Sequence, residues 1–420
     1  MLNAIKNKNT LLWLVGLGIL FPLFFQLGGG IYNDIHPTTD SQGVISTLPL
    51  PISILTCLFG LAFFLRRLTD ARVALLMIGA TIAVSIISLF LGADDSIPLL
   101  RKSIVIVQVV LPLVGLLLGV IVNEQEDVIA RAFLTVITII VPLQLIATWL
   151  QGGLLLTQYL YWFSIYSHFQ YVTLIFVCAY AYSLTSLWQS HKTWLCLVAL
   201  PVFFYVLSGL SFLTMFAFAS LSIAFSIQVL WRYRANFKLI AISVILFIGI
   251  GLGGLTYFGK MFEQERAARG ESGMFVGKFK SVAEGNIPVN LQERFGDWRM
   301  FLNGVAESPK TIWFGHPQPM PREVRTSPHN WYIDIAYTFG IIALLPVAAL
   351  IAYTGWLLFK RRKVLSGQTW WLAIIVFYLV IIDSNFKVTL RQPYPGIFAY
   401  FMWGLLLTRL GYNLTPKSKP

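Results

Sequence analysis

Residues 73–92 read VALLMIGATIAVSIISLFLG, a run of twenty residues without a charged side chain. A helix of about 20 mostly apolar residues spans the hydrocarbon core of a bilayer. Similar runs recur along the 420-residue chain, in which 57% of the residues are hydrophobic and 12% are charged. Soluble domains carry roughly 25% charged residues, so this chain has too few charges to cover a water-facing surface. We therefore predict an all-α polytopic membrane protein.

Twelve apolar stretches are candidates for transmembrane helices, and we predict that all twelve span the membrane. They are residues 11–29, 49–65, 73–92, 98–122, 128–150, 169–189, 195–208, 210–230, 238–258, 329–359, 369–386 and 396–411. No small-residue cleavage site follows the first stretch, so we expect it to remain in the membrane. The predicted organisation is helices 1–9 within 1–258, a long loop at 259–328, and helices 10–12 within 329–420.

The short loops predict the orientation, because cytoplasmic loops carry an excess of Lys and Arg. Basic residues precede the first helix, follow the second, sixth, eighth and tenth, and end the chain, whereas the loops at 30–48 and 151–168 contain none. We therefore expect both termini in the cytoplasm and residues 259–328 on the opposite side. The net charge of +13 fits this pattern. No nucleic-acid-binding motif accompanies it, so no nucleic-acid partner is predicted.

The loop at 259–328 is long and rich in both acidic and basic residues. A loop of this length without structure of its own is uncommon unless it is functional. Asn290 and Glu293 suggest a helix start, and the apolar residues that follow are at helical spacing. We therefore predict an amphipathic helix over 291–305 that lies at the membrane interface.

Arg101 and Lys102 begin the fourth apolar stretch, just after Asp94 and Asp95. Basic residues in a short loop on this side run against the positive-inside bias. They could pair with the two aspartates or extend to lipid headgroups. The functional alternative is a phosphate-binding arginine.

Two features of the long loop and its end carry further candidate residues. Arg294 and Trp298 are four residues apart and share a helix face, whereas Arg299 points elsewhere. The planar guanidinium suits a diphosphate, although an interfacial helix with solvated charges has the same spacing. His329 and Asn330 open the tenth helix. An unperturbed histidine can act as a base at neutral pH, although a histidine at a helix start is more often a cap.

The histidines and cysteines favour no metal site. The three cysteines lie inside apolar runs and show neither metal-ligand nor disulfide spacing. Zinc sites need clustered His, Cys or carboxylate ligands, and the histidines on the outer side form no such cluster in the sequence. We therefore predict neither a metal nor another cofactor.

The order of these residues resembles the signature region of a known family. RFGDWRMFLNGVAESPKTIWFGHP (294–317) and SPHNWYIDIAYTFGIIALL (327–345) are similar to the long periplasmic loop and following helix of the O-antigen ligase and polymerase family. That family has Arg-x-x-x-Trp, then Pro, a hydrophobic-Gly turn, and His-Asn with Gly about eleven residues on. The matching residues are Arg294, Trp298, Pro309, Phe314, Gly315, His329, Asn330 and Gly340, with Arg101 matching an arginine early in the family's sequences.

The resemblance implies a C-type glycosyltransferase fold in the bacterial inner membrane. It implies metal-independent, inverting transfer of a glycan from undecaprenyl diphosphate to lipid A–core oligosaccharide on the periplasmic face. His329 would be the base, and Arg101, Arg294 and Arg299 would bind the donor diphosphate. Trp298 and Tyr332 would line the sugar site. Lys102, Asn330 and Gly340 would support these residues, and membrane lipids would surround the protein.

The sequence also departs from the family pattern. The outer turn before the eighth helix, at 208–211, lacks the family's arginine, and Ala343 stands at the family's small or polar position three residues after the helix glycine. Another arginine could supply the missing phosphate contact; the candidates are Arg299, Arg322, Arg325 and Arg391.

Two alternative functions remain open. Fifteen residues separate Arg299 from Gly315, which resembles a polymerase pattern, so the acceptor could be a second lipid-linked glycan. A secondary anion transporter is the alternative from another class, although the two halves show no repeat and the charges gather at the outer face. Asp383, an acid within the eleventh apolar stretch, is the exception to this distribution of charges. We expect it to pair with Lys387 or a loop arginine.

Overall fold

The computed structural model describes a large part of the chain, in two compact units. The described residues are 8–27, 48–93, 99–122, 126–150, 153, 169–209, 211–232, 249, 253, 257, 259–261, 264–265, 284–287, 289–317, 320, 324 and 327–411. Unit 1 comprises Met1–Ala132 with Glu293–Pro420, and unit 2 comprises Phe133–Gln292.

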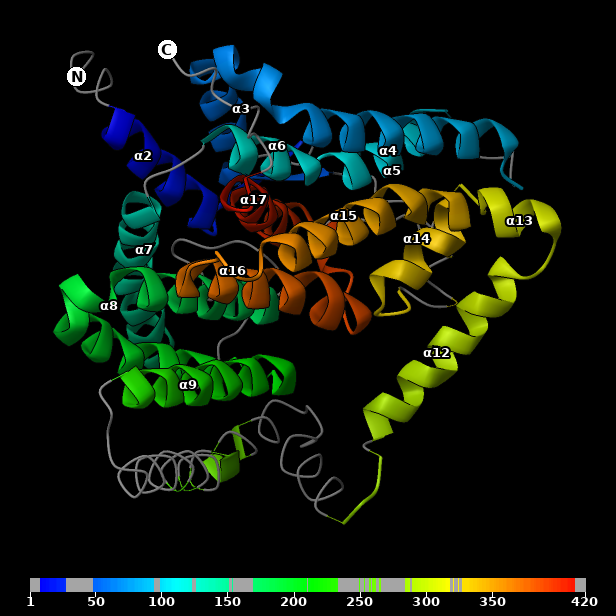
Figure 1. Cartoon of the computed structure of the whole chain (residues 1–420). Coiled ribbons are helices and arrows are strands. Elements are labelled where there is room, and N and C mark those ends of the chain that lie inside the picture. Colours follow the sequence, from blue (N-terminus) through cyan, green and yellow to red (C-terminus); the bar gives the residue numbers. More distant parts are fainter. Residues whose placement is uncertain are drawn as a thin grey trace. The chain divides into compact units, whose positions relative to one another are not determined.

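The described chain is mostly helical and has the make-up of a polytopic membrane protein (Figure 1). Seven helical segments among the described residues are long and apolar enough to cross a membrane. They are Arg72–Leu91, Val105–Val122, Asp127–Leu150, Gln170–Ser208, Leu213–Leu230, Ile341–Arg361 and Gly367–Asn385. The predicted helical membrane class is confirmed at this level, whereas the number twelve stays a prediction.

Unit 1 combines elements from both ends of the chain. The N-terminal part supplies α2 (Lys8–Leu20), β1 (Phe24–Leu27), β2 (Leu48–Pro51), α3 (Ile52–Phe63), η1 (Leu65–Ala71), α4 (Arg72–Leu91), α5 (Leu99–Val110) and α6 (Leu113–Val122). The C-terminal part supplies most of α12 (Val289–Val305), then α13 (Pro309–Phe314), α14 (Trp331–Phe339), η2 (Ile341–Leu344), α15 (Leu345–Arg361), α16 (Gly367–Phe377), the π-helical η3 (Tyr378–Ile382), η4 (Asp383–Asn385), η5 (Thr389–Arg391) and α17 (Pro393–Arg409).

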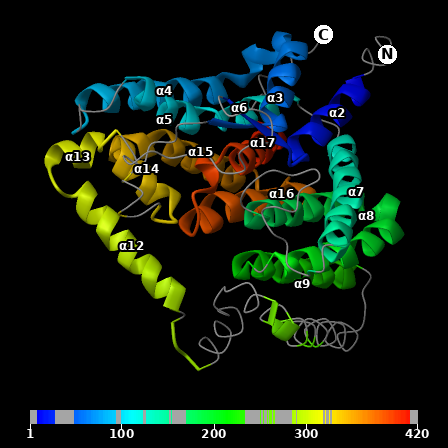
Figure 2. The same cartoon turned by 180° about the vertical axis from the view of Figure 1, so that it is seen from behind.

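The core of unit 1 is α17, which packs against α6 and α16 (Figures 1 and 2). Every residue from Pro393 to Leu407 is buried. Glycines allow α6 and α17 to approach closely, because a Cβ at Gly119 would lie 2.3 Å from the carbonyl oxygen of Phe401. A Cβ at Gly404 would likewise lie 2.5 Å from the carbonyl oxygen of Leu116. Small residues at such contacts are typical of helix packing in membranes.

Two of the predicted helices are interrupted. The predicted helix at 98–122 divides at Pro112, where the proline cannot donate the backbone hydrogen bond of a continuing helix. The predicted helix at 329–359 is wrong as a single helix, because α14 ends at Gly340 with a φ of 77°. The tenth candidate span is therefore Ile341–Arg361, and α14 precedes it as a separate short helix.

Unit 2 contains α7 (Glu126–Leu150) from Phe133 onward, α8 (Phe169–Ser208) and α9 (Phe212–Arg232). Within this unit, α9 packs along α8 (Figure 2). α8 folds back on itself at His191, whose φ of −133° is not helical. The Tyr180 hydroxyl donates to the carbonyl oxygen of Leu195 at 2.8 Å. These two residues would be about 22 Å apart along a straight helix. The prediction of two helices at 169–189 and 195–208 is therefore confirmed, whereas their crossing of the membrane as two spans stays a prediction.

The remaining predicted helices are shorter or lie outside the described residues. α2 and α3 are apolar but shorter than a full span, since the neighbouring residues form β1 and β2. These strands pair antiparallel, with Phe24 opposite Pro51, and they are a small exception to the all-α prediction. The predicted helix at 238–258 lies almost wholly outside the described residues.

Candidate functional site

One face of α12 carries Arg294 and Trp298 and lies against the segment that follows α16. The Arg294 Nη1 donates a hydrogen bond to the carbonyl oxygen of Phe386 at 3.0 Å. The Trp298 and Phe386 rings are tilted, with 6.3 Å between their centroids. Phe301, farther along this helix, is buried, whereas Arg299 is exposed. The prediction that Arg294 and Trp298 share a face from which Arg299 is absent is confirmed.

The turn before α14 is held from two sides. The Trp298 indole N–H donates to the carbonyl oxygen of Pro328 at 2.8 Å. The Asn330 amide donates to the Asn385 side chain at 3.2 Å, and its oxygen accepts from two backbone N–H groups in the first turn of α14. Asn330 is therefore the N-cap of α14. We name this group of residues the α12–α14 junction: Arg294, Trp298, Pro328, His329, Asn330, Asn385 and Phe386.

His329 lies in the turn of the junction with its side chain exposed. Its φ of 51° is the only positive φ of a non-glycine residue among the residues described. Its backbone N–H donates to the Ser327 hydroxyl at 3.1 Å. Backbone outliers of this kind cost energy and persist where surrounding contacts hold them, often at functional sites. Asn330, not His329, caps the helix, so capping does not explain the histidine.

Gly315 and Gly340, the two glycines of the family motif, meet each other. A Cβ at Gly315 would lie 2.5 Å from the Gly340 nitrogen, and a Cβ at Gly340 would lie 2.1 Å from the carbonyl oxygen of Trp313. Both glycines have a positive φ with a ψ near 180°, a backbone conformation that only glycine adopts readily. The Ser88 hydroxyl of α4 donates to the carbonyl oxygen of Phe339 at 2.6 Å. Gly340 therefore ends α14 and contacts α13, instead of lying inside a single helix over 329–359 as predicted.

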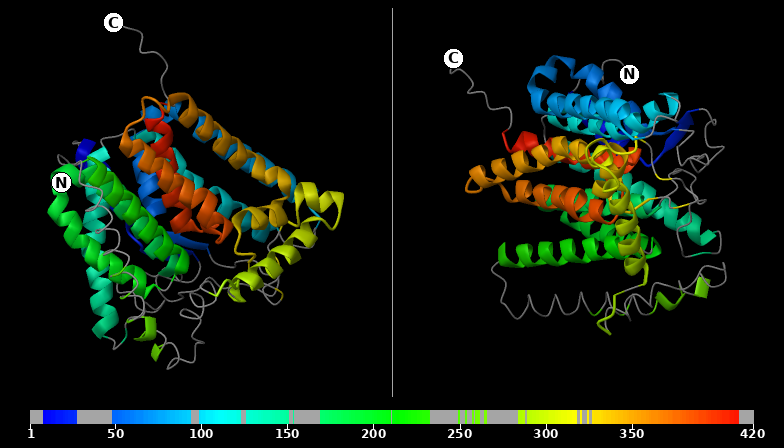
Figure 3. Two further views of the ribbon diagram at one scale, coloured as in Figure 1. Left: turned by 60° about the horizontal axis from the view of Figure 1, so that its bottom comes forward. Right: turned by 90° about the vertical axis from the view of Figure 1, so that its right-hand side faces the viewer.

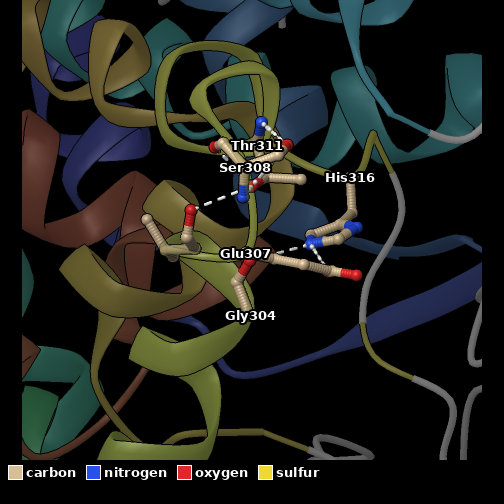
Figure 4. A network of polar contacts seen from close by, with 6 residues as sticks. Gly304, Glu307, Ser308, Thr311 and His316 are labelled. Atoms are coloured by element: carbon tan, nitrogen blue, oxygen red, sulfur yellow. Dashed lines mark hydrogen bonds and ion pairs between the residues drawn. The ribbon is translucent and has the colours of Figure 1, made fainter.

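A polar network fixes α13 and the residues after it (Figure 4). Ser308 and Thr311 form a reciprocal capping box at the start of α13. The His316 Nε2 lies 3.1 Å from the carbonyl oxygen of Gly304 and 3.6 Å from a Glu307 carboxylate oxygen. His316 therefore ties α13 back to α12.

Tyr332, predicted to line the sugar site, points to η3. Its hydroxyl donates to the carbonyl oxygen of Val380 at 2.8 Å. Burial raises the pKa of Tyr332 to about 12, which keeps the hydroxyl a proton donor even at alkaline pH. In this structure Tyr332 acts as a fixed donor between α14 and η3.

A buried ion pair lies beside the junction. Asp383 is fully buried, and its Oδ1 lies 3.5 Å from the Lys387 Nζ, while its Oδ2 accepts a hydrogen bond from the Thr389 hydroxyl. The predicted pairing of Asp383 with Lys387 is confirmed. Breaking a buried pair typically costs 3–5 kcal/mol. The pair links the two ends of the segment that carries Asn385 and Phe386, and loss of either partner would leave the other charge buried and uncompensated.

A second buried pair joins α14 to η5. Arg391 forms an ion pair with Asp334, and both side chains are almost completely buried. Arg391 therefore has a carboxylate partner inside the protein and is not placed as a substitute phosphate contact. The sequence analysis missed Asp334. Its signal was an acidic residue within an apolar stretch, where charges are rare and usually functional or paired.

Some of the predicted site residues lie outside the described part of the structure. Arg101 and Lys102 occupy the first turn of α5, but the structure does not describe their side chains. α5 contacts η5, the element that carries Arg391. Four further predicted residues lie outside the description altogether: Asp94, Asp95, Arg322 and Arg325.

The described residues contain no group of three or more His, Cys, Asp or Glu side chains that could hold a metal ion. No protein-family model matches the sequence. No curated protein is a significant match either. The family resemblance therefore depends on the motif residues themselves.

Proposed function

We propose that the chain is a membrane glycosyltransferase of the O-antigen ligase type. It transfers a glycan from undecaprenyl diphosphate to lipid A–core oligosaccharide on the periplasmic face of the bacterial inner membrane. The observation that carries this proposal is the α12–α14 junction, which gathers Arg294, Trp298 and His329 from two separate segments. A cation for a diphosphate, an aromatic ring for a sugar and a base for a hydroxyl are the groups that the reaction needs.

Arg294 binds the donor diphosphate in this proposal. The guanidinium donates to the carbonyl oxygen of Phe386, and this bond directs the side chain. Its permanent charge and planar fork suit phosphate oxygens. The same charge offsets the negative charge that grows on the diphosphate as it leaves. Arg101 is the proposed second cation. It belongs to α5, and α5 contacts η5, the element that follows the junction residue Phe386 in the chain.

His329 is the proposed base. Its imidazole takes the proton from the acceptor hydroxyl while the hydroxyl oxygen attacks the anomeric carbon of the glycan. The bond from that carbon to the diphosphate oxygen breaks, and undecaprenyl diphosphate leaves with the bonding electrons. This single displacement inverts the anomeric centre. The exposed His329 side chain and the fixed turn that carries it support this assignment.

The test is a competition between acceptors. Purified protein in liposomes receives an undecaprenyl-diphosphate-linked glycan together with lipid A–core and a second lipid-linked glycan. We expect the product on lipid A–core. Extension of the second lipid-linked glycan would instead favour the polymerase. If neither product forms and sealed vesicles take up an anionic substrate, the transporter becomes the better account.

Variants at α12 and α13 separate a phosphate contact from a general charge effect. Arg294→Gln should lower turnover about 10²–10³-fold, the usual cost of removing a preorganised charge contact. Arg294→Lys should restore part of the activity, since lysine keeps the charge but not the fork. Lys310→Gln removes the same charge from an exposed position on α13 and is the matched control. Equal losses in Arg294→Gln and Lys310→Gln would contradict the proposed role.

A further inference from the structure

Four consecutive basic residues, 360–363, form the end of α15 and the start of the turn after it. Arg361 donates to the carbonyl oxygen of Gly411 at 3.3 Å and so ties α15 to the end of α17. The other three, Lys360, Arg362 and Lys363, are exposed. We call these three exposed residues the basic turn. Arg361 is half-buried, whereas Arg362 donates to the carbonyl oxygen of Phe359 at 3.3 Å within its own helical turn and stays exposed, as do Lys360 and Lys363.

Exposed aromatic rings lie directly beneath two residues of the basic turn. The Lys360 Nζ lies over the Trp356 ring at 4.8 Å, and the Arg362 guanidinium lies over the Phe359 ring at 4.2 Å. Trp356 is 51% exposed and Phe359 is 68% exposed. Tryptophan at the end of a membrane span lies at the level of the lipid headgroups. The two cations above these rings therefore lie at the level of the lipid phosphates.

Among the described residues, no acidic side chain pairs with this positive charge. From residue 335 to the C-terminus, Asp383 is the single Asp or Glu in the sequence, and it pairs with Lys387. No ion pair joins the basic turn to a carboxylate within the described residues. A group of cations beside exposed rings, with no carboxylate partner in the described part of the chain, is complementary to an anionic phosphate that has apolar chains attached.

The basic turn and the candidate site lie at opposite ends of unit 1. Figure 3 shows the turn between α15 and α16 at the end away from α13 and α14. The span Ile341–Arg361 has 21 residues, which is about 30 Å of helix and enough to cross the hydrocarbon core. The basic turn therefore faces the leaflet opposite to the junction.

We propose that the basic turn binds the headgroup of an anionic phospholipid in that leaflet. Lys360, Arg362 and Lys363 contact the phosphate, and the acyl chains lie along Trp356 and Phe359. Each basic residue near an anionic membrane surface contributes about a fivefold gain in binding. This lipid site is independent of the proposed glycan transfer, so its own binding experiment tests it.

The test counts lipids bound to delipidated protein by native mass spectrometry. The protein is titrated with phosphatidylglycerol or with phosphatidylcholine, and we expect a preference for phosphatidylglycerol. Lys360→Gln combined with Arg362→Gln should weaken phosphatidylglycerol binding about 30-fold and leave phosphatidylcholine binding unchanged. Lys417→Gln combined with Lys419→Gln removes the same charge near the C-terminus and is the matched control.

Three results would overturn the proposal. The first is an equal loss in the control pair, which would mean a net-charge effect. The second is displacement of phosphatidylglycerol by millimolar inorganic phosphate, which would mean a site for the free ion. The third is equal binding of the two lipids. If the double variant does not fold, the single variants Lys360→Gln and Arg362→Gln replace it, each with an expected loss of about fivefold.

Discussion

Replacing Gly340 by alanine tests whether the contact between α13 and the end of α14 holds the candidate site together. Gly340 has a φ of 77° and a ψ of 172°, a conformation that costs other residues about 1–3 kcal/mol. Its Cβ would lie 2.1 Å from the carbonyl oxygen of Trp313, whereas ordinary contacts begin at 3.4 Å. Forcing packed segments apart costs about 1–3 kcal/mol more. We therefore expect Gly340→Ala to lower the free energy of unfolding by about 2–6 kcal/mol.

The matched control is Gly355→Ala in α15, because nothing lies within 4 Å of a Cβ at Gly355. Alanine is the better helix former by about 1 kcal/mol, so the control should be neutral or more stable. Both variants are unfolded in detergent with increasing denaturant and followed by tryptophan fluorescence. If Gly340→Ala unfolds at the same denaturant concentration as Gly355→Ala, the contact contributes nothing and the argument fails.

Three further predictions concern the core, the junction and the orientation. Gly119→Ala should destabilise the protein by about 1–3 kcal/mol in the same unfolding assay, because its Cβ meets the α17 backbone, whereas Gly79→Ala meets nothing and should not. Trp298→Phe keeps a ring on α12 but loses the hydrogen bond to Pro328, so we expect a stability loss of about 0.5–1.5 kcal/mol and lower turnover; normal turnover would mean that this bond does not position the turn. Lys310→Cys, in a chain without its native cysteines, should react with an impermeant maleimide added from the periplasmic side, and reaction from the cytoplasmic side alone would reverse the topology.

The sequence predicted the elements whose signal is local. The uninterrupted apolar run at 73–92 became α4, and the spacing of Arg294 and Trp298 correctly placed both side chains on one face of α12. The break at Gly340 was missed because the glycine lies inside an apolar run. Gly340 is required both by its own positive φ and by the close approach of Trp313 on another helix, and the second requirement leaves no pattern in the sequence near Gly340.

The contacts that assemble the candidate site are long-range, and the sequence did not predict them. Phe386 accepts the Arg294 hydrogen bond through its backbone carbonyl, and a carbonyl has no residue-type signature. Asp334 and Arg391 are single charges in separate apolar segments, and only the fold decides that they pair. Asp383 and Lys387 were predictable because they are four residues apart.

His329→Ala is the variant that tests the proposed glycan transfer most directly. Turnover per folded molecule is measured with an undecaprenyl-diphosphate-linked glycan and lipid A–core, and donor affinity is measured on the same preparation. The proposed base predicts a loss of about 10²–10⁴-fold in turnover with donor affinity retained, because in the proposal arginine, not histidine, binds the diphosphate. Normal turnover in folded His329→Ala would contradict the account.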